Sequence, residues 1–170
     1  MADFPRRVNF VAGQMLSAED LQIEQNYHRS MRHLQNRLHG HGVIQGLEIA
    51  TGADGIGISP GIAIDARGRE LVLAEPRLVR LDPRGRMEES EILMVWAQAP
   101  GRTVPSPDGQ ELVTLWIERP EEMVVAPGQG PPDAVLLART VLSDQGEVTI
   151  DRSVCTRHPL ADQEATGPDR

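Results

Sequence analysis

Five histidines are the residues of this chain best suited to bind a metal or move a proton. His28 and His33 stand five positions apart in a helix-like stretch, which separates them by about 140° around a helix and prevents them from gripping one ion. His39 and His41 flank Gly40, but a metal site needs further converging ligands, and none is evident. Helix capping and turn packing explain this pair better. We therefore expect no metal site and no cofactor.

The other reactive side chains show no catalytic arrangement. Carboxylates occur as adjacent pairs in turns or strands, where neighbours point in different directions and do not form the facing pair of a glycosidase. The chain has no GxSxG or GxGxxG motif, and its serines show no histidine and aspartate framework. Cys155 is the only cysteine, so no internal disulfide can form and a buried thiol is expected. We expect a protein that is not an enzyme.

Composition and charge exclude several classes of protein. The 170 residues are 39% hydrophobic and 25% charged, which fits a compact domain rather than a disordered or fibrous chain. The net charge of -8 disfavours nucleic-acid binding. No stretch approaches the roughly 20 apolar residues of a membrane helix, and no signal peptide is evident at the N-terminus. We expect a protein made in the cytoplasm that binds no nucleic acid and does not insert into a membrane.

Residues 1–16 are predicted to form an extended arm. Pro5 blocks an early helix, and the apolar residues that follow prefer strands. A free tail would not carry so many apolar side chains, so we expect the arm to pack across a sheet or onto a neighbouring subunit. Its candidate partner-binding residues are Phe4, Val8 and Phe10.

A long helix is predicted over residues 17–39, with Ser17 as its N-cap and Gly40 as its stop. One side carries a narrow apolar seam made of Tyr27, Met31, Leu34 and Leu38. The opposite side is polar, and its candidate partner-binding residues are Gln25, Arg29, Arg32 and Asn36. The seam is expected to pack on the sheet as domain core, the usual use of an amphipathic helix. The alternative is a seam between subunits of a homo-oligomer, for which a trimer is plausible.

After Gly40 the pattern changes to short apolar runs separated by turns, which is typical of antiparallel strands. We predict about eight strands within residues 40–160. The fold class is therefore α+β, with a mainly antiparallel β-sandwich or barrel-like body. The structural turn residues are Gly40, Gly42, Gly46, Pro60 and Gly61.

Loops and the C-terminal end complete the predicted organisation. Two stretches rich in proline and glycine, residues 100–110 and 126–133, are predicted to be long loops. The polar residues 161–170 are predicted to be a disordered tail. Arm, helix and body are expected to form one domain.

Two stretches together resemble a known family. They are residues 10–49, FVAGQMLSAEDLQIEQNYHRSMRHLQNRLHGHGVIQGLEI, and residues 58–73, ISPGIAIDARGRELVL. They resemble small structural proteins, of the baseplate or fibre-attachment kind, from phage tails and phage-tail-like contractile injection systems. The helix-to-strand unit is the more distinctive of the two.

The resemblance implies a structural assembly role without catalysis, exerted through contacts with other subunits of a tail-like particle. It also implies assembly in the producing bacterium into a particle that is released or membrane-associated. Two alternatives stay open: a carbohydrate-binding or hydrolytic β-domain carried by such a particle, and a histidine-dependent metalloenzyme. Converging buried histidines and carboxylates would favour an enzyme, whereas exposed apolar surfaces would favour assembly.

Overall fold

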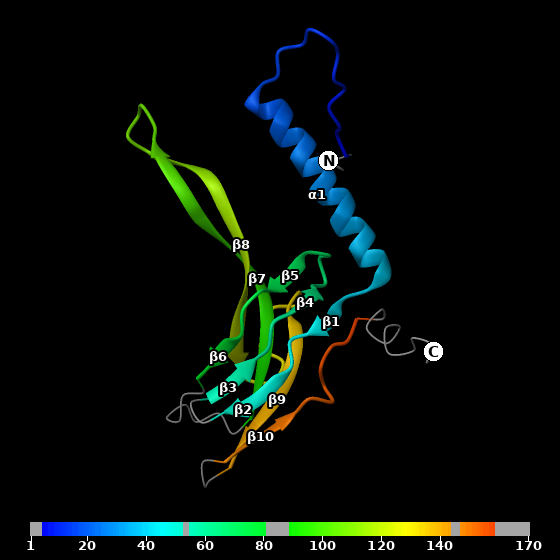
Figure 1. Ribbon diagram of the computed structural model, residues 1–170, viewed down its shortest axis with the longest axis vertical. Helices are drawn as coiled ribbons and strands as arrows, with labels where there is room; N and C mark the ends of the chain where they lie inside the picture. The colour runs from blue at the N-terminus through cyan, green and yellow to red at the C-terminus, as the bar shows by residue number, and fades with distance from the viewer. Residues whose placement is uncertain (1–4, 53–54, 81–88, 144–146, 159–170) are drawn as a thin grey trace, which may run out of the picture.

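The computed structural model describes residues 5–52, 55–80, 89–143 and 147–158. Phe4 and the predicted tail, residues 161–170, lie outside these ranges. Within them the chain forms one helix followed by ten strands (Figure 1). Their bounds are α1 (Ala18–His39), β1 (Gly42–Gly46), β2 (Ile49–Gly52), β3 (Gly55–Ile58), β4 (Gly61–Ile64), β5 (Glu70–Leu73), β6 (Arg77–Val79), β7 (Glu89–Pro105), β8 (Glu111–Val125), β9 (Val135–Leu142) and β10 (Val148–Asp151).

Both ends of α1 follow the local signals in the sequence. The Ser17 hydroxyl accepts a hydrogen bond from the Asp20 backbone N–H at 3.1 Å, and the Asp20 carboxylate accepts the Ser17 N–H at 2.9 Å. This reciprocal pair satisfies two N–H groups that the helix leaves unpaired. At the other end Gly40 has a φ of 106° and donates its N–H to the Arg37 carbonyl. The predicted N-cap and stop are confirmed.

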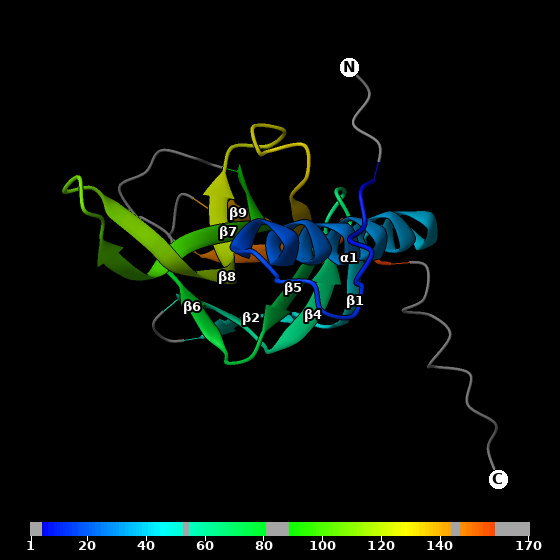
Figure 2. The same cartoon turned by 90° about the horizontal axis from the view of Figure 1, so that it is seen from above.

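The strands form three antiparallel sheets, which makes the fold α+β as predicted. Two are three-stranded, with the orders β1-β4-β5 and β2-β3-β6, and the third has the order β10-β9-β7-β8. Among the described strands no sheet closes on itself, so the barrel-like alternative is wrong. In Figure 1 α1 and the outer part of the β7–β8 ribbon extend away from the body, and Figure 2, seen from above, shows the ribbon reaching out to one side of the helix.

The hydrophobic core is formed by residues from all three sheets. It combines Ile56, Ile58 and Leu71 from the small sheets with Met94 and Leu137 from the large one, all nearly inaccessible to solvent. These side chains are almost all aliphatic, because the chain has few aromatic residues. No residue of α1 is buried, so the helix contributes nothing to this core.

The two stretches that carry the family resemblance lie side by side, because β1 pairs with β4. Gly46 faces Gly61 in this pairing, and Gly46 has a φ of 63°. A Cβ atom on Gly46 would overlap the Pro60 carbonyl oxygen, and one on Gly61 would overlap the backbone at residues 45–47. Gly42 is equally confined, by the backbone of residues 156–158. Glycine at these positions therefore lets the strands approach closely.

The prediction of a long loop at residues 100–110 is wrong. Residues 100–110 are mostly strand, because cross-strand pairing continues out to Pro105 and Glu111. Proline is tolerated at strand edges and bulges, and the register indeed shifts just after Pro100. The turn itself shrinks to residues 106–110. The second predicted loop, residues 126–133, does lie between β8 and β9 without regular structure.

Candidate assembly surface

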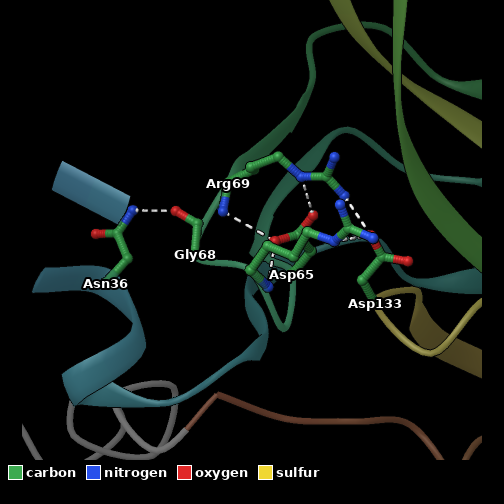
Figure 3. Close-up of polar contacts among 6 residues, drawn as sticks. Asn36, Asp65, Gly68, Arg69 and Asp133 are labelled. Carbon is green, nitrogen blue, oxygen red and sulfur yellow. Dashed lines mark hydrogen bonds and ion pairs between the residues drawn. The ribbon is translucent and has the colours of Figure 1, made fainter. Parts of the chain in front are cut away.

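The turn between β4 and β5 is built around a buried carboxylate, that of Asp65, which has no exposed surface. It accepts the backbone N–H groups of Arg67 and Arg69 at 2.8 and 2.9 Å and forms an ion pair with the Arg69 side chain at 2.5 Å (Figure 3). A buried charge is stable only when it is paired and hydrogen-bonded in this way. The turn is therefore rigid and holds Arg69 in one orientation.

Arg69 connects this turn to the large sheet. Its guanidinium donates to the Asp133 carboxylate at 2.7 Å, in the loop before β9. It also lies 4.5 Å from the ring centroid of Trp96 on β7, a cation–π contact. Arg67 adds a second, more exposed ion pair to Asp133 at 2.7 Å. One arginine thus joins the turn, the loop and the sheet.

The helix rests on the far side of the same turn. Asn36 donates from its side-chain amide to the Gly68 carbonyl at 2.8 Å (Figure 3). The same amide also donates to the Glu70 carboxylate at 2.9 Å. Gly68 has a φ of 83°, and a Cβ atom there would overlap the His33 carbonyl oxygen. The helix backbone and the turn backbone are therefore in direct contact.

Two ion pairs extend this docking along the helix. Arg32 pairs with Glu70 at 2.7 Å, and Arg29 pairs with Glu118 of β8 at 3.2 Å. Three of the four polar residues predicted to bind a partner, all except Gln25, thus contact the chain's own body. The predicted polar face is the side by which the helix attaches to its own sheets.

Leu34 and Leu38, the C-terminal part of the apolar seam, point the other way. Positions two apart lie on nearly opposite sides of a helix, and Leu34 and Leu38 stand on either side of Asn36 in the sequence. Leu34 is 43% exposed and Leu38 is 78% exposed, while Tyr27 and Met31 are half-buried. The expectation that this seam is domain core is wrong within the single chain. The reason is that the turn at residues 65–69 offers polar partners, which select the polar face.

A cleft of about 780 Å³ separates α1 from β8. Its walls include Leu21, Gln25 and Met31 on the helix and Glu118 on the strand. Gln25, the remaining residue of the predicted polar set, is exposed and lines this cleft. The ion pair between Arg29 and Glu118 crosses it.

The arm lies beside the start of the helix. The Val8 backbone N–H donates to the Glu24 carboxylate at 3.3 Å, and Val8 is half-buried. Phe10 is 53% exposed, and its neighbour Val11 is 62% exposed. The arm therefore leaves apolar side chains in solvent, as does the outer part of the β7–β8 ribbon, where the exposed residues are Val104, Leu112, Leu115, Trp116 and Ile117.

The reactive residues do not converge. In the ranges that the structure describes, no three His, Cys, Asp or Glu side chains are grouped so as to hold a metal ion. Burial raises the pKa of the Cys155 thiol, which keeps it protonated and weakly nucleophilic at neutral pH. His158 is 2% exposed, and burial lowers its pKa more than a hydrogen bond with the Gly40 backbone raises it. No described helix is long and apolar enough to cross a membrane.

Sequence reasoning missed the residues that fix the helix. Asp133 stands 64 positions from Arg69, and no local pattern connects them. Asp65 lies inside the PGIAIDARGRE stretch of the family resemblance, which was the available signal. Glu118 directly follows the LVTLWI run, and no local pattern connects it to Arg29.

Comparison with known proteins gives a structural relationship only. No protein-family model matches the chain, and no curated protein matches it. A chain in the cryo-electron microscopy structure of the type VI secretion system TssK-TssF-TssG baseplate subcomplex is similar, with a TM-score of 0.56 and 14% identity over 86% of this chain. The crystal structure of TssK is similar with a TM-score of 0.52 and 10% identity over 87% of this chain.

The match spans 60% of the first of these chains and 41% of the second. At such low identity the similarity concerns the fold. The chains that share it come from a type VI secretion system baseplate subcomplex and from TssK, so the resemblance of the sequence to baseplate proteins is borne out at the level of the fold.

Proposed function

We propose that this protein is a non-enzymatic structural component of a phage-tail-like particle, of the contractile injection system or tail-baseplate kind. It acts through contacts with other subunits and is assembled into the particle inside the producing bacterium. The solved subcomplex that shares its fold contains several baseplate subunits, which supports partners of that class. The arm, helix and body work as one unit in this role.

The observation that carries the proposal is the orientation of α1. The helix uses its polar side to attach to its own body and leaves Leu34 and Leu38 exposed. Burying apolar side chains is the main favourable term in protein association, and adjoining exposed apolar residues mark interaction surfaces. The seam of Tyr27, Met31, Leu34 and Leu38 is thus a contact surface for another subunit. A second copy of the same helix fits it, because a seam of this spacing packs against its like in helix bundles.

The experiment replaces the exposed part of the seam. Leu34→Ser with Leu38→Ser is expected to change the free energy of unfolding of the isolated chain by less than about 1 kcal/mol, because both side chains are already in solvent. The same variant is expected to be lost from intact particles that are sedimented from the producing bacterium. Urea unfolding and immunoblotting of the sedimented fraction measure the two effects.

Gln22→Ser is the matched control, because Gln22 is an exposed residue of the same helix outside the seam, and the variant introduces the same residue type. It is expected to leave sedimentation unchanged. Wild-type protein absent from sedimented particles would contradict the proposed function. If the double mutant sediments as well as wild type, the seam is not the contact surface, and that part of the proposal is wrong.

The two alternative functions gain no support from the described residues. A histidine-dependent metalloenzyme needs a ligand cluster, and the histidines do not form one. For a carbohydrate-binding or hydrolytic domain, the cleft beside α1 is a poor candidate, because it is open and the ion pair between Arg29 and Glu118 crosses it.

A further inference from the structure

The strand β8 lies at the end of its sheet. In the order β10-β9-β7-β8, β8 pairs with β7 on one side, and no described strand pairs with its other side. The backbone N–H and C=O groups along such an edge can pair with a strand from another chain. Pro120 interrupts the edge close to the body, but residues 111–118 contain no proline.

This outer part of β8 is apolar. Residues 112–117, LVTLWI, carry no charge, and Leu112, Leu115, Trp116 and Ile117 are each between 45% and 52% exposed. Strand-forming segments without charge or proline pair readily with other strands, and proteins usually protect them. The opposite edge of the same ribbon is protected, because Pro100, Gly101 and Pro105 interrupt β7 over the same length. The unprotected edge of β8 is thus suited to receive a strand.

The arm has the complementary property. Its residues Val8, Phe10 and Val11 favour strands, but residues 5–10 form no backbone-to-backbone hydrogen bond within the part of the chain that the structure describes. The Val8 N–H is satisfied only by the side chain of Glu24. The same molecule therefore carries a strand-forming segment that pairs with no described sheet, and a sheet edge that pairs with no described strand.

The arm and the outer edge of β8 also carry opposite charges. Arg6 and Arg7 are exposed, and the first acidic residue after them is Glu19, so residues 5–16 carry two positive charges in a protein of net charge -8. The apolar run of β8 is flanked by Glu111 and Glu118. Whichever direction the arm takes along β8, its two arginines lie near one of these carboxylates.

We propose that residues 6–11 of one copy add as a strand to the outer edge of β8 in a second copy. The contact pairs backbone groups that lack partners, covers the LVTLWI run and neutralises charge. It joins two different surfaces, so it is heterologous and can close into a ring. It rests on the proposed function because it names a second copy as one of the subunits contacted in the particle.

The test crosslinks two different full-length variants that each carry one cysteine, in a Cys155→Ser background. One variant is Val8→Cys and the other, distinguished by an affinity tag, is Thr114→Cys. Each protein has a single thiol, so a short bis-maleimide cannot join the arm to its own ribbon. A mixed covalent dimer, recognised by its mass, is the expected product.

Thr51→Cys on β2 is the matched control, because Thr51 is also an exposed threonine on a strand at the end of its sheet, away from the ribbon. It is expected to give little mixed dimer. Adding Arg6→Glu and Arg7→Glu to the Val8→Cys variant is expected to lower the yield with Thr114→Cys by about tenfold at low salt. No mixed dimer with Thr114→Cys, or equal yields with Thr51→Cys and Thr114→Cys, would overturn the proposal.

The crosslinking result and the particle result are separate readouts. Sedimentation of the wild-type chain with particles, but no mixed dimer, would leave the proposed function standing and refute strand addition. A selective mixed dimer from a chain that never sediments with particles would refute the proposed function and keep strand addition as a mode of self-association.

Discussion

Asp65 holds a negative charge where water does not reach it. Its carboxylate is compensated by two backbone N–H groups and by Arg69, and Arg69 in turn reaches Asp133 and Trp96. Every polar atom in such a network depends on its neighbours. Removing one charge leaves the others buried with an incomplete set of partners, which costs more than the net value of any single bond.

Asp65→Asn is therefore expected to lower the free energy of unfolding by about 3 kcal/mol, because Arg69 loses its closest counter-charge in a buried setting. Urea or thermal unfolding followed by circular dichroism measures this. Arg67→Ala is the control, since that ion pair to Asp133 is largely solvated and contributes at most about 1 kcal/mol. Equal losses in the two variants would show that the buried network contributes no more than the exposed pair.

At the level of elements, the helix is attached by a close approach of two backbones. Gly68 is the point of contact, and its neighbours in space are the His33 carbonyl and the Arg37 side chain. The contact leaves no room for a methyl group. The tilt of α1 relative to the sheets is thus fixed by one glycine and by the hydrogen bond from Asn36 to the Gly68 carbonyl.

Gly68→Ala and Gly109→Ala form a matched pair. Both glycines have a φ near 80°, but nothing lies within 4 Å of a Cβ atom on Gly109. Gly109→Ala is expected to cost about 1 kcal/mol of backbone strain. Gly68→Ala is expected to cost clearly more and to loosen the helix, which amide hydrogen exchange along residues 29–39 detects. Similar exchange in the two variants would mean that the helix does not depend on this contact.

The sequence could predict the limits of the helix but not its orientation. Ser17 and Gly40 act through neighbours three or four residues away, so their roles follow from local pattern. The choice between the Asn36 side and the Leu38 side depends on which groups the sheets present. Those groups, Glu70 and Gly68, become neighbours of the helix only after the chain has folded. In the ribbon, pairing with the next strand, β8, outweighed the local preference of Pro100 for a loop.

For the whole molecule, Glu91 links stability to pH. Its carboxylate accepts the Gly128 backbone N–H and an Arg139 hydrogen bond, both at 2.9 Å. The Gly128 bond, followed by Arg139, lowers the pKa of Glu91 below its usual 4.5, against the opposing effect of burial. The folded state therefore holds this proton less tightly than the unfolded state does. The contribution of this carboxylate to the free energy of unfolding is complete above its usual pKa. It is lost as the pH falls towards the lower pKa that the carboxylate has in the folded state.

The free energy of unfolding is thus expected to fall below about pH 5, and Glu91→Gln is expected to flatten this part of the profile. Urea unfolding at several pH values between about 7 and 3 gives the slope. Glu89→Gln serves as the control, because Glu89 is exposed and begins the same strand. A Glu91→Gln profile as steep as that of wild type would show that other carboxylates carry the acid sensitivity.

The polar attachment of the helix also has a mechanical consequence. A force applied along α1 passes from Asn36 into the turn, from Arg69 to Asp133, and from there into β9. Hydrogen bonds and ion pairs are directional, so these contacts resist sliding of the helix over the sheets. Apolar packing between a helix and a sheet permits such sliding more readily. A molecule built in this way can transmit a load from its helix to its large sheet without the two slipping past each other.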